Sequence, residues 1–361
     1  MIMKRRLVFG SVFILFTHIG HAQDAYYTKL DAQAIRSCLF IEDDQLRLRC
    51  FDDATGRSEV SKNGAPPQVV EKLGQGLLLY KKASDTTLSW FDRRWELAPE
   101  SKRGTFSISP YKPVYLLPLF HNSKPNNLPS SPNPANVVTS SQDLDQNEAK
   151  FQLSLKTKVW ENMFGDNGDL WFAYTQSSRW QVYNAGQSRP FRETNYEPEM
   201  IFTWRASWND FAEKTGWNPR LLGLSLNHQS NGRANPLSRS WNRVIGMIGM
   251  ERENTMVLFR PWVRIPEKPE NDDNPDIEDY MGRADMLIVH KTHGHELSWL
   301  LRHNLRGGDV SRGAVQFDWA FPISSSLKGH MQIFSGYGES LIDYNHRSDY
   351  FGLGLSLVDW Y

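Results

Sequence analysis

The feature that most limits what this chain can fold into is the alternation of apolar and polar residues within short segments. Between Phe151 and Val159, large apolar side chains fall at odd positions and polar ones lie between them. The stretches 315–321 and 297–302 repeat the pattern. A period of two places successive side chains on opposite faces of a β-strand. The pattern therefore predicts an all-β protein whose strands have one apolar and one polar face.

A water-soluble β-sandwich also alternates, so the length and composition of the segments matter. The segments run to roughly ten residues, as tilted membrane strands do, and aromatic residues make up 12% of the chain. After the N-terminus, no uninterrupted apolar stretch reaches the ~20 residues that a spanning helix needs. These observations favour a transmembrane β-barrel over a helical membrane bundle.

The alternating segments number twelve, an even number as single-chain bacterial barrels have. They lie near residues 108–120, 150–160, 169–180, 196–208, 220–230, 239–251, 254–264, 283–292, 295–303, 312–321, 329–338 and 348–361. Long connections at 121–149, 181–195, 265–282 and 304–311 interleave with short ones at 252–253 and 293–294. We therefore expect a twelve-stranded antiparallel barrel over 105–361, with long external loops and short periplasmic turns. The final Trp360 and Tyr361 fit an interfacial aromatic girdle.

The N-terminus resembles an export signal. A basic start, Lys4-Arg5-Arg6, precedes an apolar run from Leu7 to Ile19, and Gly20-His21-Ala22 follows. This pattern predicts a cleaved signal peptide over 1–22 rather than a membrane anchor.

Residues 23–104 alternate little and are expected to form a small periplasmic segment and connector. In that segment Cys38 and Cys50 favour a disulfide, because an exported protein reaches an oxidising compartment. A metal-binding pair is the weaker alternative, since the chain has no further thiol.

The charge balance excludes one class of partner. Lys and Arg together number 41, as do Asp and Glu, so the chain has no formal net charge. Nucleic-acid binding leaves a basic footprint, and we expect no nucleic-acid partner.

One segment carries residues suited to nucleophilic catalysis. Leu222, Leu224 and Leu226 mark the apolar, outward face of their strand, and His228 and Ser230 continue the same parity. Residues two apart lie ~6.6 Å from each other on one face, so the imidazole can approach the hydroxyl and activate it. The chain turns at Gly232 and Pro236 and returns, which brings Asn242 beside them. An asparagine can accept the imidazole N–H and hold its tautomer.

A His-x-Ser pair on its own is weak, because such pairs also occur by chance at an aqueous rim. Its position on a lipid-facing strand favours the catalytic interpretation. The chain contains no Gly-x-Ser-x-Gly elbow, which argues against an α/β-hydrolase.

The sequence around this pair resembles the bacterial outer membrane phospholipase A family. The resemblance rests on residues 227–233 and 238–243, with further matches at 190–198, 273–276 and 335–344, and it spans about 105–361. It implies a calcium-dependent phospholipase A1/A2, also active on lysophospholipids, on a twelve-stranded barrel that works as a homodimer.

The resemblance also implies roles for individual residues. Ser230 would be the nucleophile, His228 the general base and Asn242 its orienting partner, while the Gly232 N–H would contribute to the oxyanion hole. Ca²⁺ would be held by the Ser238 hydroxyl, the Arg233 carbonyl and Ser188 from the partner subunit. Gln176 would bond across the dimer interface, although a residue at the membrane interface is an alternative.

Two acidic features bear on calcium. The family often has an acid where this chain has Asn235, and the missing charge weakens the expected affinity for Ca²⁺. The acidic stretch 272–279 lacks the EF-hand spacing and is expected to be a solvated external loop.

Two functions of different classes are consistent with these observations. The first is hydrolysis of membrane phospholipids in the outer membrane, with the N-terminal segment and the C-terminus periplasmic. The second is a passive porin or structural barrel. Residues expected to point inward, such as Gln152, Lys156 and Lys158, fit both.

Overall fold

The structure of the chain is a computed structural model. It describes residues 38, 43, 46–48, 50, 51, 88–324 and 327–357. The expected signal peptide and the terminal Trp360 and Tyr361 lie outside the described residues. The chain divides into two compact units, residues 1–83 and 84–361. In the first, Cys38 and Cys50 are disulfide-bonded, with their Cα atoms 5.6 Å apart.

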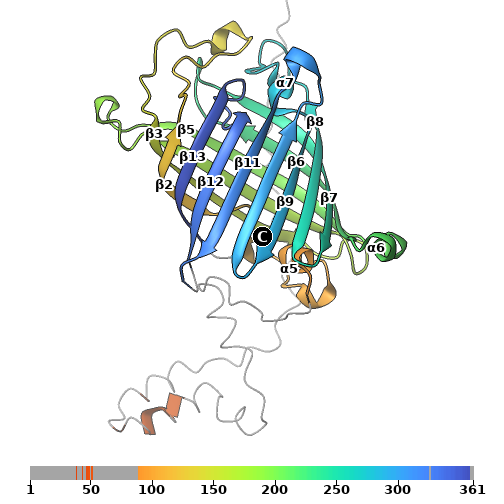
Figure 1. The fold of residues 1–361 in the computed structure, drawn as a ribbon. Coiled ribbons are helices and arrows are strands. Elements are labelled where there is room, and N and C mark those ends of the chain that lie inside the picture. Colours follow the sequence, from red (N-terminus) through yellow and green to blue (C-terminus); the bar gives the residue numbers. More distant parts are fainter. Residues whose placement is uncertain are drawn as a thin grey trace, which may run out of the picture. The chain divides into compact units, whose positions relative to one another are not determined.

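The second unit is a closed antiparallel β-barrel (Figure 1). In its described part, β2 to β13 each pair with the next strand along the chain, and β13 pairs with β2 to close the circle. The strands are β1 (Ile108–Pro110), β2 (Tyr115–Asn122), β3 (Asn147–Trp160), β4 (Asp169–Trp180), β5 (Phe191–Arg205), β6 (Asn218–Ser230), β7 (Ser240–Arg252), β8 (Thr255–Ile265), β9 (Ala284–Thr292), β10 (His295–His303), β11 (Gly313–Pro322), β12 (Leu327–Tyr337) and β13 (Arg347–Leu357). The prediction of an all-β, twelve-stranded barrel is confirmed.

The first of the twelve predicted segments is interrupted in the structure. β1 and β2 pair with successive parts of the same edge of β3. Between them, Pro113 has no N–H to donate to a ladder, and the Lys112 N–H donates instead to the Ser154 hydroxyl, 3.0 Å away. A break in the ladder at this point therefore follows from the sequence.

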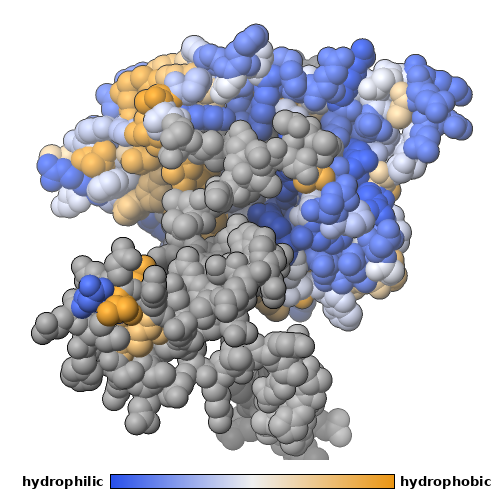
Figure 2. All heavy atoms as spheres, turned by 90° about the horizontal axis from the view of Figure 1, so that it is seen from below, coloured by the Kyte–Doolittle hydropathy of each residue, from blue (hydrophilic) through white to orange (hydrophobic). Residues whose placement is uncertain are grey.

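Alternation separates the two faces of the wall. On β3, Leu153 and Leu155 are about half exposed, whereas Ser154, Lys156 and Lys158 are buried in the interior. Figure 2 shows apolar side chains on the outer wall of the barrel. The outward apolar face suits lipid, and the polar face points into the barrel.

Helix α5 (Trp90–Trp95) packs into the barrel interior. Phe91 and Trp95 are buried in one cluster with Trp171 and Leu221 of the wall. The rings of Trp95 and Trp171 meet edge to face at 5.8 Å. Helix α5 thus belongs to the same compact unit as the barrel, although it precedes residue 105, where we expected the barrel domain to begin. A period-two search misses this segment, because a helix repeats every 3.6 residues.

The connections differ at the two ends of the barrel. The six at one end are 123–146, 181–190, 231–239, 266–283, 304–312 and 338–346, and they include η2 (Pro134–Asn136), η3 (Ala185–Gln187), α7 (Ile277–Met281) and η4 (Gly308–Val310). At the other end, 253–254 and 293–294 are two-residue turns, and 206–217 carries α6 (Asn209–Thr215). Beyond them, η1 (Pro99–Ser101) follows α5. Among the described residues, no helix combines the length and apolar character needed to cross a bilayer.

Candidate active site

Two neighbouring strands carry the predicted catalytic residues. His228 and Ser230 lie at the end of β6, and Asn242 lies at the start of β7, directly opposite His228 in the ladder. His228 is exposed on the outer wall, whereas Asn227 beside it is buried inside. Strand parity therefore places His228, Ser230 and Asn242 on the outer face, as the sequence predicts.

A hydrogen bond joins the histidine to the asparagine. His228 Nδ1 lies 2.8 Å from Asn242 Oδ1. An amide oxygen only accepts, so the ring donates its Nδ1–H and leaves the Nε2 lone pair free. Ser230 follows two residues later on the same face, ~6.6 Å along the strand. The geometry provides an imidazole with a basic nitrogen on the same outward surface as a serine.

The strand register aligns four outward residues at one level of the wall. Ser230 on β6 pairs with Tyr196 on β5, Tyr196 with Gln176 on β4, and Gln176 with Leu153 on β3. Neighbouring strands lie ~4.8 Å apart, so Gln176 is roughly 10 Å from Ser230 across the sheet. The Tyr174 hydroxyl donates to Gln176 Oε1 at 3.3 Å. This alignment puts the expected dimer residue on the same face and at the same level as Ser230.

The connection 231–239 is held by a buried asparagine. The Asn231 amide donates to Glu193 and to the Leu237 carbonyl, and its oxygen accepts from the N–H groups of Arg233 and Arg239. Within the loop, Gly232 has a φ of +62°, and a Cβ there would lie 3.0 Å from the Tyr196 ring. Glycine suits this position for both reasons.

Arg239 and Asn136 also hold the connection 231–239 in place. The buried Arg239 guanidinium donates to the carbonyls of Pro236, Ser238 and Asn136. Asn136, from the connection 123–146, donates to the Asn235 side-chain oxygen at 3.1 Å and to the Ser238 carbonyl at 2.9 Å. Two segments distant in sequence, the connections 123–146 and 231–239, thus shape the surface near Ser230.

The expected metal ligands fall in two different loops. Arg233 and Ser238 share the connection 231–239, whereas Ser188 ends η3 in the connection 181–190. The Ser238 hydroxyl donates to Asp273 at 2.6 Å. In the described part of the chain, His, Cys, Asp and Glu side chains form no group of three that could hold a metal ion. A metal here would need hydroxyl and carbonyl oxygens besides the single carboxylate.

The acidic stretch 272–279 is more ordered than we expected. Asp272 is buried and pairs with Arg264 at 2.6 Å, and the fully buried Asn274 accepts from the Ser240 N–H. Asp276 accepts from the Tyr344 hydroxyl at 2.5 Å, and burial raises its pKa. The first part of the stretch therefore packs against the site instead of being solvated, whereas Glu278 and Asp279 are partly exposed.

The sequence analysis predicted no role at the site for two acidic residues. Asp273 contacts Ser238, and Glu267 accepts a hydrogen bond from the Asn242 amide at 2.9 Å. Asp273 belongs to the motif 273–276, one of those that carry the family resemblance. Membership of that motif was the one sequence feature that could have indicated a role at the site. Glu267 has no such signal, because its contact joins two separate parts of the chain.

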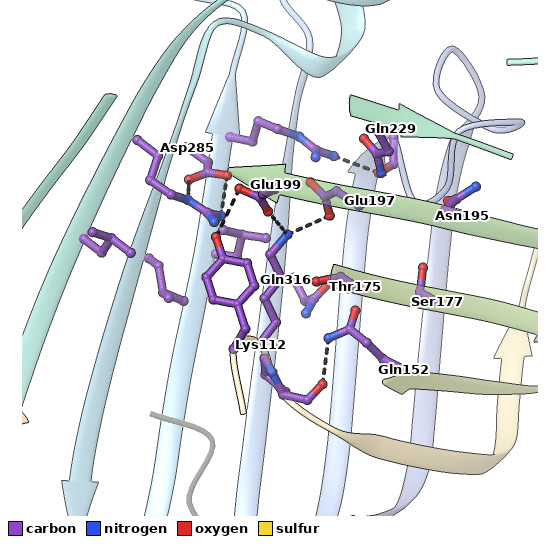
Figure 3. Close-up of a pocket in the computed structure, with 18 of the residues that line it drawn as sticks. Lys112, Gln152, Thr175, Ser177, Asn195, Glu197, Glu199, Gln229, Asp285 and Gln316 are labelled. Atoms are coloured by element: carbon purple, nitrogen blue, oxygen red, sulfur yellow. Dashed lines mark hydrogen bonds and ion pairs between the residues drawn. The ribbon is translucent and has the colours of Figure 1, made fainter. Parts of the chain in front are cut away.

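The inner face behind the site is also polar, and several of its charges are paired. A cavity of about 230 Å³ lies there. Figure 3 shows Lys112 between Glu197 and Glu199, which lie 2.6 and 3.3 Å from its ammonium group. Arg243 reaches Glu197 at 3.2 Å and Asn227 at 2.7 Å. These contacts give Asn227 on β6 and Arg243 on β7, whose side chains point inward, a structural role.

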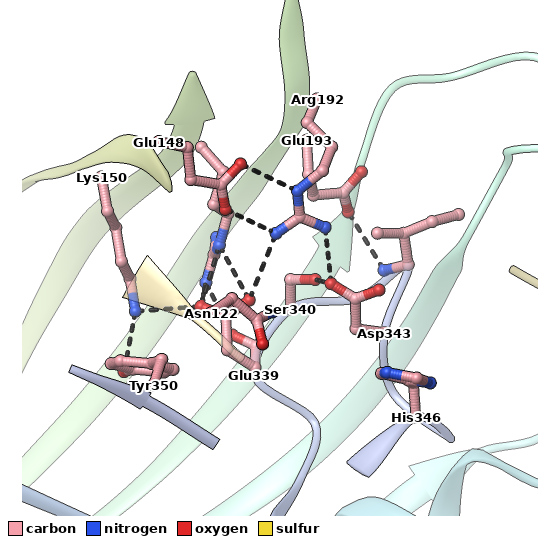
Figure 4. A network of polar contacts seen from close by, with 12 residues as sticks. Asn122, Glu148, Lys150, Arg192, Glu193, Glu339, Ser340, Asp343, His346 and Tyr350 are labelled. Atoms are coloured by element: carbon pink, nitrogen blue, oxygen red, sulfur yellow. Dashed lines mark hydrogen bonds and ion pairs between the residues drawn. The ribbon is translucent and has the colours of Figure 1, made fainter. Parts of the chain in front are cut away.

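A second buried network lies toward the end with the long connections (Figure 4). Glu339 is 2.7 Å from Arg179, 3.0 Å from Lys150 and 3.7 Å from Arg192. Arg192 also pairs with Glu148 and Asp343. Burial by itself would raise the pKa of Glu339, but the three cations hold it well below its usual range.

Comparison with known sequences identifies relatives of the whole barrel. A family model described as phospholipase A1 matches residues 91–357. The chain is 35% identical over 353 residues to a candidate phospholipase A1 of Neisseria meningitidis serogroup B, covering 89% of this chain and 90% of that protein. It is 39% identical over 214 residues to phospholipase A1 of Escherichia coli K12, covering 59% of this chain and 71% of that one.

Solved structures share the fold. Outer membrane phospholipase A from Escherichia coli superposes with a TM-score of 0.62 at 34% identity, covering 71% of this chain and 100% of that one. The calcium-bound dimer of the Salmonella typhi outer membrane phospholipase gives 0.63 at 34% identity, covering 72% and 95%. An active-site asparagine-to-alanine mutant of the Escherichia coli protein gives 0.62 at 33% identity, covering 72% and 95%. Because the family model spans residues 91–357, with both strands that carry the site, this chain belongs to the phospholipase A1 family of outer membrane β-barrel enzymes.

Proposed function

We propose that this protein hydrolyses acyl esters of membrane phospholipids through Ser230, His228 and Asn242. The observation that carries the proposal is the 2.8 Å hydrogen bond between His228 and Asn242 on the outer wall, on the same face as Ser230. A polar group facing lipid is costly, and such groups mark functional sites. The solved active-site asparagine mutant of a relative supports a role for an asparagine in this family.

The chemistry would proceed in two halves. The Ser230 Oγ attacks the ester carbonyl carbon while its proton passes to His228 Nε2. The tetrahedral intermediate collapses, the C–O bond to the glycerol breaks, and the imidazolium returns the proton to the leaving lysophospholipid oxygen. Water, deprotonated by the same nitrogen, then attacks the acyl-enzyme, and the fatty acid leaves as Ser230 regains its proton.

The oxyanion needs donors close to Ser230. Gly232 lies two residues further along the chain, where positive φ turns the backbone sharply. Its N–H is our candidate donor to the oxyanion. Loss of one such donor commonly costs about 10²- to 10³-fold in rate.

The donor set around Ser238 suits a hard cation. Asp273 places a carboxylate against the Ser238 hydroxyl, and this carboxylate supplies charge that Asn235 lacks. Together with the Arg233 carbonyl these are oxygen ligands, which Ca²⁺ prefers. Bound there, Ca²⁺ would add positive charge near the developing oxyanion.

One subunit offers fewer ligands than Ca²⁺ usually takes, which is six to eight counting waters. Ser188 from the partner subunit is our candidate for a further ligand, with Gln176 bonding across the interface. The Salmonella typhi relative was solved as a dimer with bound calcium. We propose that dimerisation completes the site and so controls activity.

The lengths of the connections indicate how the barrel is oriented in the membrane. We propose that the six long connections face the exterior, because long loops are typical of that side. The substrate would then be lipid of the outer leaflet. The two-residue turns and the end of β13 would face the periplasm.

Lipolysis by the purified protein tests the proposal. Ser230→Ala should abolish fatty-acid release from phospholipid micelles, and chelation should abolish it in the parent until Ca²⁺ is restored. Ser207→Ala, an exposed serine in the connection 206–217, is the matched control and should keep full activity. Release that persists in Ser230→Ala would refute the nucleophile. No release by the parent would favour a passive barrel.

A further inference from the structure

Glu267 is the second residue after β8. The last residue of β8, Ile265, pairs with Asn242 in the ladder, so the chain leaves the sheet beside the catalytic asparagine. Glu267 is partly buried there, and its Oε1 accepts from Asn242 Nδ2 at 2.9 Å. The contacts form a chain from Glu267 through Asn242 to His228.

The Glu267 carboxylate determines the orientation of the Asn242 side-chain amide. A primary amide has a donating end and an accepting end of nearly equal size. An ionised carboxylate only accepts, so it selects the NH₂ end of Asn242. The oxygen is then left for His228, and it can accept only from a protonated Nδ1. Through Asn242, Glu267 thus selects the imidazole tautomer whose Nε2 is free to take the serine proton.

Glu267 also supplies a charge that asparagine lacks. Partial burial and the like charge of Asp272 raise the pKa of Glu267. Arg264, which is itself paired with Asp272, and the hydrogen bond from Asn242 act in the opposite direction and favour the ionised carboxylate. A negative charge one hydrogen bond beyond Asn242 polarises the amide oxygen toward the imidazolium that forms during catalysis.

We propose that Glu267 is a positioning residue, which holds the Asn242 amide in the orientation that prepares His228 as the base. The inference rests on the proposed function. It adds a fourth member to the triad, from a loop outside the β6–β7 hairpin.

The first experiment measures serine reactivity without turnover. A fluorophosphonate with a long alkyl chain should label Ser230 covalently, and mass spectrometry gives the rate and the site. We expect Glu267→Ala to lower both the labelling rate and kcat about tenfold, with KM for micellar phospholipid unchanged. Glu270→Ala, an exposed glutamate of the same loop, removes the same charge and should label at the parent rate.

A second experiment separates positioning from a merely structural role. Asn242→Asp alone sets two carboxylates against each other and should label slowly. Adding Glu267→Gln restores an NH₂ donor to the pair, so the double variant should label several times faster than Asn242→Asp. A structural role predicts additive losses instead.

The outcomes distinguish this inference from the proposed function. If the probe still labels Ser230→Ala at the parent rate, the nucleophile is wrong and the proposed function fails. If Ser230→Ala blocks labelling but Glu267→Ala labels at the parent rate, Glu267 has no positioning role. Additive losses in the double variant, with folding verified by circular dichroism, would also overturn the inference.

Discussion

The inner and outer faces of the same strands use polar residues in opposite ways. Asn227 and His228 are neighbours on β6, but Asn227 is buried between Glu197 and Arg243, whereas His228 faces outward to Asn242. Inside, Glu197 is paired with Lys112 and Arg243, and such pairing offsets the desolvation of the charged groups. Outside, the surroundings are apolar, and polar residues gather where the chemistry is proposed. The comparison teaches that burial of a polar residue here indicates structure and its outward exposure indicates function.

Substitution of His228 and of Asn227 should distinguish the roles of the outer and inner faces most clearly. His228→Ala removes the base and should lower kcat by about 10⁴-fold or more, with thermal stability unchanged. Asn227→Ala breaks buried hydrogen bonds and should cost about 1–3 kcal/mol of stability, with kcat of the folded protein within tenfold. Lipolysis and unfolding in urea measure the two effects. A loss of stability in His228→Ala equal to that in Asn227→Ala would contradict the division.

On the inner face, we expect the largest loss of stability when Glu339 is replaced. Glu339→Ala leaves three buried cations without their shared carboxylate, and breaking a buried ion pair typically costs about 3–5 kcal/mol. We expect a lower unfolding midpoint and near-normal kcat in the protein that remains folded. Glu270→Ala serves as the exposed comparison, with no measurable change.

The same network predicts a pH dependence. The pKa of Glu339 is lowered in the folded state, so its stabilisation is complete above the unfolded pKa of about 4.3 and is lost as the pH falls through the lower folded value. The stability gap between the parent and Glu339→Gln should therefore stay constant near neutrality and shrink only below about pH 4. A gap that closes between pH 6 and 8 would show that another group controls it.

The smallest effect is expected at Gln176 on the outer face. Gln176→Ala should weaken dimerisation by about 0.6 kcal/mol, or roughly threefold, as hydrogen bonds between membrane segments commonly do. Energy transfer between labelled subunits in detergent measures it. Val315→Ala, an outward residue on β11, is the control. Equal weakening by both variants would indicate a general loss of apolar surface.

Local pattern was sufficient to predict most of the fold. The alternation between 150 and 160 predicts β3 and the inward direction of Lys156 and Lys158, because a strand's period is set by its own backbone. Parity likewise placed His228 and Ser230 outside. Helix α5 was missed because its partners, Trp171 and Leu221 among them, lie far along the chain.

The supporting residues of the site were harder to predict for the same reason. Asn136, Asp273 and Glu267 act through contacts with residues 25 to 102 positions away. Such contacts depend on how the loops pack, which no local period encodes. The acidic composition from 272 onward predicts a solvated loop, and only the packing of the folded chain buries Asp272 and Asn274.

The three proposed catalytic side chains lie within residues 228–242, on one hairpin whose ladder already aligns His228 with Asn242. Because the hairpin itself aligns these residues, it could be grafted onto an unrelated barrel. His228 would still lie opposite Asn242 there. The graft would lack Glu267 and Asp273, which belong to the next loop and contact Asn242 and Ser238. A transplanted hairpin would therefore serve as a primitive esterase, from which the gain due to each supporting loop could be measured one addition at a time.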